Sequence, residues 1–139
     1  MGGKQYFGIG FENQFGGFEI RNPYSKICLG KKDITLIQSN TKSSEIAIFE
    51  GFFDYLTFRN LEKNQSSTCD YLILNSTSML FKAEEILKNY SQIFLFLDND
   101  ENGKSTKLKI QNQYKSLEDC SLIYHDFKDL NEWWCSNKR

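Results

Sequence analysis

Apolar runs and helix-like segments alternate along the chain from residue 45 onward. Runs of aliphatic and aromatic residues predict buried strands at 45–49, 70–74, 92–97 and 120–125. The segments between and after these runs predict helices at 52–63, 77–90, 102–117 and 129–136. Such alternation favours a parallel sheet with helices packed on both of its faces. We therefore expect an α/β domain over residues 45–139.

Residues 1–44 have a different composition. They hold seven of the nine glycines and the only proline. Short strand-like segments at 5–9 and 17–21 are separated by turn residues, which predicts a short β-rich N-terminal extension. The extension carries six Lys or Arg against three acids, a balance of +3, so the remaining residues sum to −4. Ordinary scatter of surface charge and a basic flank beside an acidic site both fit this asymmetry.

The composition excludes several classes of protein. With 139 residues, 40% of them apolar and 15% aromatic, the chain is long and apolar enough for one globular domain. Neither an apolar run of about 18 residues nor a secretory pattern is present, so we expect no membrane span and a cytoplasmic protein. The four cysteines are scattered without a C-x-x-C pair, which argues against a zinc ribbon and for reduced thiols.

Acidic residues follow two of the predicted strands. The strand at 92–97 is followed by Asp98-Asn99-Asp100-Glu101-Asn102-Gly103, and the strand at 45–49 by Glu50-Gly51, with Asp54 three residues later. After Lys42 the only glycines are Gly51 and Gly103, and each lies beside one of these acidic clusters. Open α/β sheets bind their ligands at the carboxyl ends of parallel strands, where both clusters are expected.

Three interpretations of the segment 98–103 compete. It matches the first six positions of an EF-hand calcium loop, but the twelfth position, which should be a bidentate glutamate, is Lys109. It also fits a polar turn in which Asp98 or Asn99 caps the following helix. The third interpretation is a magnesium site for phosphoryl or nucleotidyl transfer that Glu50 completes.

The two acidic segments resemble the motifs of a known family. Residues 46–54, Ile-Ala-Ile-Phe-Glu-Gly-Phe-Phe-Asp, are similar to the glutamate motif of the Toprim domain of bacterial-type primases, topoisomerases and OLD-type nucleases. Residues 96–103 are similar to its D-x-D-x-x-G motif, and Lys128-Asp129-Leu130-Asn131-Glu132 resembles the K-D-x-[ND]-[DE] stretch of primase-type copies. The resemblance implies a small Rossmann-like sheet, which agrees with the strand–helix alternation.

The segments 16–23 and 28–35 resemble the region ahead of Toprim in primase-like proteins of bacterial mobile elements. In that family this region belongs to a basic subdomain that faces the template or the incoming nucleotide. The family's primases also carry an N-terminal zinc-binding module, and nothing in this sequence can form one. The resemblance therefore implies a zinc-binding or helicase domain as a partner, and no zinc in this chain.

The resemblance assigns roles to the acidic residues. Asp98 and Asp100 are expected to hold Mg²⁺, which Mn²⁺ could replace, and Glu50 to bind a metal or to act as a general base on a primer 3′-hydroxyl. Gly51, Asp54 and Gly103 are expected to support the site, although Asp54 also fits a simpler role as an acid favoured by the helix dipole.

Cations near these motifs are candidates for phosphate contacts. Arg21, Lys31 and Lys32 lie in the basic extension, and Lys104 follows Gly103 near a helix N-terminus. Each also fits a solvated surface position. We expect a Mg²⁺-dependent primase-like nucleotidyltransferase core that acts on single-stranded DNA with nucleoside triphosphates. The alternatives are a Toprim nuclease and a non-catalytic module that binds nucleic acid or protein.

Overall fold

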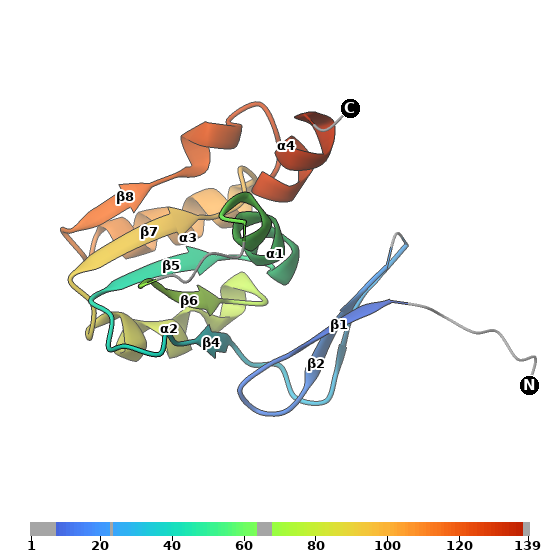
Figure 1. The fold of residues 1–139 in the computed structure, drawn as a ribbon, viewed down its shortest axis with the longest axis horizontal. Helices are drawn as coiled ribbons and strands as arrows, with labels where there is room; N and C mark the ends of the chain where they lie inside the picture. Colours follow the sequence, from blue (N-terminus) through green and yellow to red (C-terminus); the bar gives the residue numbers. More distant parts are fainter. Residues whose placement is uncertain (1–7, 23, 64–67, 138–139) are drawn as a thin grey trace, which may run out of the picture.

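The computed structural model describes residues 8–22, 24–63 and 68–137, which form a small and a large β-sheet (Figure 1). The small sheet is antiparallel, with the strand order β1-β2-β3. Its strands are β1 (Ile9–Glu12), β2 (Phe18–Arg21) and β3 (Lys26–Leu29). The region 1–44 is therefore rich in strands, as expected. In the predicted strand 5–9, residues 5–7 lie outside the described residues.

The large sheet has five strands in the order β4-β6-β5-β7-β8. Its strands are β4 (Thr35–Ile37), β5 (Glu45–Phe49), β6 (Asp70–Ile73), β7 (Gln92–Phe96) and β8 (Leu117–Asp119). All neighbouring pairs are parallel except β4 with β6. The predicted parallel sheet is confirmed, and residues of the N-terminal region add an antiparallel strand at one edge.

Helices cover both faces of the large sheet. They are α1 (Phe52–Leu61), α2 (Leu80–Leu87), α3 (Glu101–Gln111) and α4 (Leu130–Asn137), together with the 3₁₀ helices η1 (Thr77–Met79) and η2 (Ser121–Tyr124). Ile46 and Ile48 of β5 pack with α2 and α3, whereas Ala47 and Phe49 pack with α1 and α4. A strand buried on both faces explains the unbroken apolar runs of β5 to β7. Within the described residues, no helix is long and apolar enough to cross a membrane.

The strand predicted at 120–125 is wrong. The last strand is β8, which ends at Asp119, and Ser121–Tyr124 is a 3₁₀ helix. Only Ser121 and Tyr124 of that helix are buried, a spacing of three residues that suits a 3₁₀ turn and not a strand. Leu122 and Ile123, whose apolar character suggested a strand, are 74% and 54% exposed. The predicted helix 102–117 likewise ends earlier, at Gln111.

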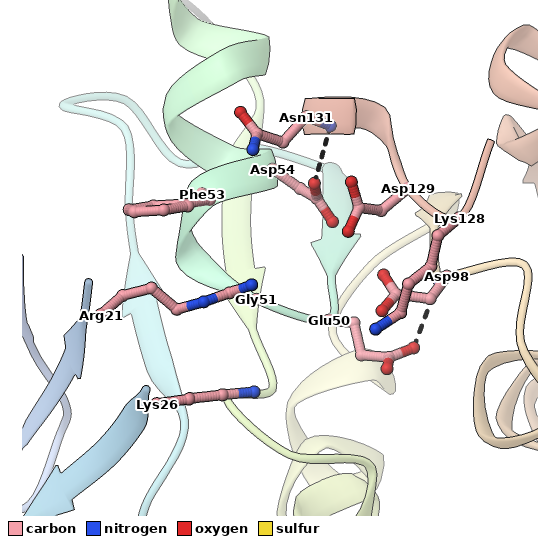
Figure 2. A pocket seen from close by; sticks show the side chains of 10 residues that line it. All are labelled: Arg21, Lys26, Glu50, Gly51, Phe53, Asp54, Asp98, Lys128, Asp129 and Asn131. Carbon is pink, nitrogen blue, oxygen red and sulfur yellow. Dashed lines mark hydrogen bonds between the residues drawn. The ribbon is translucent and has the colours of Figure 1, made fainter. Parts of the chain in front are cut away.

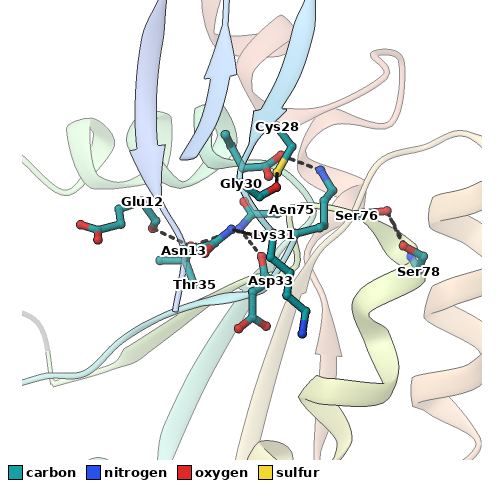
Figure 3. A network of polar contacts seen from close by, with 12 residues as sticks. Glu12, Asn13, Cys28, Gly30, Lys31, Asp33, Thr35, Asn75, Ser76 and Ser78 are labelled. Carbon is teal, nitrogen blue, oxygen red and sulfur yellow. Dashed lines mark hydrogen bonds and ion pairs between the residues drawn. The ribbon is translucent and has the colours of Figure 1, made fainter. Parts of the chain in front are cut away.

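The two sheets are joined by an aromatic contact and by polar contacts. Phe11 of β1 stacks on Phe52 of α1, with ring centroids 5.3 Å apart and planes 3° from parallel. At the end of β6, Asn75 Nδ2 donates to the carbonyl of Asp33 (2.9 Å) and to Thr35 Oγ1 (3.1 Å). Thr35 Oγ1 in turn donates to the carbonyl of Glu12 (2.9 Å), at the end of β1 (Figure 3). These contacts fix the small sheet beside the carboxyl edge of the large one.

Candidate metal centre

Three predicted acidic residues meet at the carboxyl edge of the large sheet. Glu50 follows β5, and Asp98 and Asp100 follow the neighbouring strand β7. One carboxylate oxygen from each of the three lies within 4.8 Å of the other two. The backbone N–H of Asp98 also donates to Glu50 Oε1 at 3.2 Å. Adjacent parallel strands thus bring together side chains that are 48 residues apart in sequence.

A second group of three carboxylates shares Asp98 with the first. Asp54, Asp98 and Asp129 also have carboxylate oxygens within 4.8 Å of one another. Asp54 lies in the first turn of α1 and is buried, and Asp129 precedes α4 (Figure 2). We did not predict Asp129 as a site residue, although it lies in the stretch 128–132 that resembles the family motif.

Four of the acidic residues line a small cavity, namely Glu50, Asp54, Asp98 and Asp129. Lys128 lies on their side of it, and Arg21 and Lys26 approach from the opposite side (Figure 2). The cavity has a volume of about 100 Å³. Arg21, which was predicted to contact phosphate, points into it together with Lys26. These two residues are directly paired across β2 and β3, so their side chains share one face of the small sheet. Among the described residues, Lys128 is the third cation that lines the cavity.

The other predicted cations are not among the residues that line this cavity. Lys31 lies 4.6 Å from the centroid of the Phe15 ring, and Lys32 forms an ion pair with Glu19 at 2.7 Å. Lys104 is exposed in the first turn of α3. Lys26 and Lys128 were missed because neither lies in a segment from which a phosphate contact was predicted. The pairing of Lys26 with Arg21 would have identified Lys26 as a candidate if the register of β2 and β3 had been known.

Burial and mutual repulsion perturb the acidic side chains. The pKa of Asp98 rises to about 9, first because it is buried and then because Glu50, Asp54 and Asp129 surround it. Burial and Asp129 raise the pKa of Asp54 to about 7, against the opposing effect of a hydrogen bond from the N–H of Asn131. Burial, with a smaller contribution from Asp100, also raises the pKa of Glu50.

These residues fit a hard divalent cation. All the candidate ligands are carboxylate oxygens, which Mg²⁺ and Mn²⁺ accept readily. Burial first, and then the neighbouring acids, disfavour the charged carboxylates, and a bound cation would offset both effects. The geometry therefore suits a divalent metal shared by at least three carboxylates.

The glycine of the D-x-D-x-x-G motif has a steric role. An added Cβ at Gly103 would overlap the carbonyl oxygen of Asp98 and lie 2.7 Å from its carbonyl carbon. The N–H of Gly103 donates to Asp100 Oδ1 at 2.8 Å, so Asp100 caps α3, rather than Asp98 or Asn99 as the polar-turn interpretation proposed. The EF-hand interpretation does not fit, because the loop follows strand β7 and its twelfth position, Lys109, lies in the last turn of α3.

Two family models match parts of the sequence. Residues 47–134 match the family model described as Toprim-like, and residues 1–30 match that of a domain of unknown function. No curated protein sequence matches the chain.

Two solved structures share the fold. The first is the crystal structure of the primase fragment of the bacteriophage T7 primase-helicase protein, with a TM-score of 0.68 and 19% identity. The match covers 94% of this chain but only 58% of that one. The second contains T7 lagging-strand DNA polymerase with the primase domains of two gp4 subunits bound to an RNA/DNA hybrid and dTTP. Its TM-score is 0.59 at 18% identity, covering 94% of this chain and 71% of the other.

The two motif glycines give a matched pair of variants. Gly103→Ala should lower the free energy of unfolding by about 3 kcal/mol, because its methyl group would overlap backbone that cannot move without displacing Asp98. Gly51→Ala should change it by less than about 0.5 kcal/mol, since an added Cβ there meets no atom within 4 Å. Urea denaturation followed by circular dichroism measures both. Equal stability of the two variants would contradict the steric role of Gly103.

The perturbed acids predict how stability depends on pH when divalent cations are removed. The pKa of Asp98 (about 9) and that of Asp54 (about 7) lie above the values in an unfolded chain. The folded protein therefore keeps protons that the unfolded chain has released, and its stability should fall as the pH rises through these two values. Thermal unfolding in EDTA should show the melting temperature falling from about pH 5 to about pH 9.5. Asp98→Asn should reduce that fall, whereas an unchanged pH profile in this variant would contradict the assignment.

Proposed function

The chain belongs to the Toprim-like family, and from this premise we propose that it is the catalytic core of a Mg²⁺-dependent primase-like nucleotidyltransferase acting on DNA. One observation carries the proposal. Two groups of three carboxylates share Asp98, and four of their five residues line a cavity of about 100 Å³ into which Arg21 and Lys26 also point. An anionic substrate that binds together with a divalent cation suits such a cavity, and a nucleoside triphosphate with magnesium is a ligand of this kind.

The proposed metal ligands are Glu50, Asp98 and Asp100, and the second group offers a further position through Asp54 and Asp129. Magnesium or manganese bound there would neutralise the carboxylates and bridge them to phosphate oxygens. Gly51 leaves open space beside Glu50, since an added Cβ there would meet no protein atom within 4 Å. Substrate can therefore approach the backbone closely at this position.

The proposed phosphate ligands come from the small sheet. The guanidinium of Arg21 lies 5.2 Å from the centroid of the Phe53 ring, which restricts its orientation in the cavity. Lys26 lies directly across the strand pair from Arg21. A guanidinium can bind phosphate oxygens with two parallel hydrogen bonds, and a lysine adds a compact charge. We assign the triphosphate to these two residues, and the backbone of a longer DNA strand to the outlying cations Lys31, Lys32 and Lys104.

As the alternative to a role as third metal ligand, Glu50 is the proposed general base, with Asp98 and Asp100 holding the cation. In primer extension the 3′-hydroxyl oxygen bonds to the α-phosphorus of the incoming nucleotide, pyrophosphate leaves, and the hydroxyl proton goes to a base. Burial raises the pKa of Glu50 in the metal-free protein, and a bound cation would lower it again, so the assignment rests on the position of Glu50 beside Asp98. Arg21 and Lys26 would stabilise the charge that develops on the departing phosphates.

Further domains belong to the proposal. The chain spans 58% of the T7 primase fragment, which itself comes from a primase-helicase protein. We propose that this chain works in the cytoplasm of a bacterial cell with a zinc-binding or helicase partner, on single-stranded DNA, in replication or in the transfer of a mobile element.

A primer-synthesis assay tests the proposal. Wild type and Glu50→Gln are incubated with labelled single-stranded DNA, the four nucleoside triphosphates and Mg²⁺ or Mn²⁺, and the products are separated on a gel. Glu45→Gln is the matched control, because Glu45 is an exposed acid at the other end of the same strand. We expect extended products from wild type and Glu45→Gln, and at least a hundredfold less from Glu50→Gln, because loss of a general base costs about 10²–10⁴ in rate.

The assay also separates the alternatives. Shortened DNA in the wild-type lane that depends on Glu50 would replace synthesis with phosphodiester hydrolysis at the same carboxylates. Unchanged DNA in every lane would contradict a self-sufficient catalytic core and favour a binding module.

A further inference from the structure

Asn99, the residue between Asp98 and Asp100, makes three hydrogen bonds to one later segment of the chain. The Asn99 side-chain amide donates to the carbonyls of Tyr124 (3.1 Å) and Phe127 (3.0 Å). Its backbone N–H donates to the carbonyl of Lys128 at 2.7 Å. The D-x-D loop therefore binds the backbone of residues 124–128, which lie 25 to 29 residues further along the chain, through its middle residue.

This segment carries two residues of the site. With Asp129 included, the segment 124–129 connects η2 to α4, and its last two residues, Lys128 and Asp129, line the cavity (Figure 2). Asp129 accepts a hydrogen bond from the N–H of Glu132 (2.8 Å), while the Glu132 carboxylate accepts one from the N–H of Lys128 (2.7 Å). These local bonds orient Asp129 relative to α4, but they do not connect it to the D-x-D loop.

Few other contacts fix the segment to the sheet. Tyr124, at its start, donates from its hydroxyl to the carbonyl of Leu97 (2.8 Å), and Asn131, beyond its end, donates from its N–H to Asp54 (3.0 Å). The Phe127 ring packs partly against the core. Among the described residues, the hydrogen bonds that join residues 125–129 to the large sheet and its loops all come from Asn99.

We propose that Asn99 is a positioning residue that holds Lys128 and Asp129 at the metal centre and so determines whether the second carboxylate group forms. The inference rests on the proposed function, because it assumes that the carboxylates bind a divalent cation. Asn99 touches neither the cation nor the substrate. It connects the loop that carries Asp98 to the segment that carries Asp129, and these are two of the three members of the second group.

The structure indicates which variant isolates this role. Asn99→Ala removes both side-chain hydrogen bonds and keeps the backbone N–H that donates to Lys128. The first carboxylate group has no residue in the segment 124–129, and its own contacts, from the N–H of Asp98 to Glu50 and from the N–H of Gly103 to Asp100, do not involve the Asn99 side chain. The two groups should therefore respond differently to the same substitution.

Manganese binding to the purified chain provides the test. Isothermal titration calorimetry and electron paramagnetic resonance measure the binding. Asn99→Ala should weaken the Asp129-dependent binding about 10–100-fold, the usual effect of removing a group that orients a metal ligand. Binding at Glu50, Asp98 and Asp100 should change less than about twofold. Asn112→Ala, an exposed asparagine at the end of α3, is the matched control and should bind as wild type does.

A double-mutant cycle distinguishes positioning from general destabilisation. Asp129→Asn removes the ligand charge but keeps a side chain that can cap α4. If Asn99 acts through Asp129, the double variant should bind manganese no more weakly than Asp129→Asn alone. Additive losses, or wild-type binding by Asn99→Ala, would overturn the inference. Should Asn99→Ala fail to fold, Asn99→Ser gives the same test, since its side chain is too short to reach both carbonyls.

The outcomes for the two proposals are distinct. A wild-type chain that binds no manganese would contradict the metal centre itself, and the positioning role with it. Two manganese sites of the same affinities in wild type and in Asn99→Ala would contradict only the role of Asn99.

Discussion

Repulsion among five carboxylates at one edge of the sheet is the constraint on which the site depends. Two such charges 4 Å apart repel by about 4 kcal/mol at an effective dielectric constant near 20. Each carboxylate except that of Asp98 accepts a hydrogen bond from a backbone N–H. The pairs are Asp98 to Glu50, Asn131 to Asp54, Gly103 to Asp100 and Glu132 to Asp129, with the donor named first. Asp98 belongs to both carboxylate groups and receives no such bond among the described residues. A cation at Asp98 is therefore the most direct way to stabilise the whole arrangement.

Two separate sheets must be held together for the site to work as proposed. The acids come from the large sheet and its helices, whereas Arg21 and Lys26 come from the small one. The stacking of Phe11 on Phe52 joins the small sheet to the first turn of α1, which also carries Asp54. The width of the cavity consequently depends on packing between the sheets, and the likeness to T7 primase structures extends over both of them, since it covers 94% of the chain.

The sequence predicted the features that follow from local pattern. Strands β5, β6 and β7 are continuous apolar runs because both of their faces are buried, and the acids that follow β5 and β7 could be placed from this alone. Residues 121–124 were misread because apolar residues can be exposed, as Leu122 is. Asp129 and Lys26 were missed for another reason: hydrogen bonds from Asn99 and the pairing of β2 with β3 bring them to the site. Such tertiary contacts leave no periodic signal in the sequence.

The central claim is that a divalent cation stabilises the carboxylates around Asp98. Thermal unfolding of the wild-type chain at about pH 8 with increasing Mg²⁺ tests it most directly, because at that pH the carboxylates are losing the protons that a cation would replace. A ligand that binds only the folded state raises the melting temperature as its concentration increases. The account predicts such a rise for wild type and its loss in Asp98→Asn/Asp100→Asn. A melting temperature that does not respond to magnesium, or that responds equally in both proteins, would contradict it.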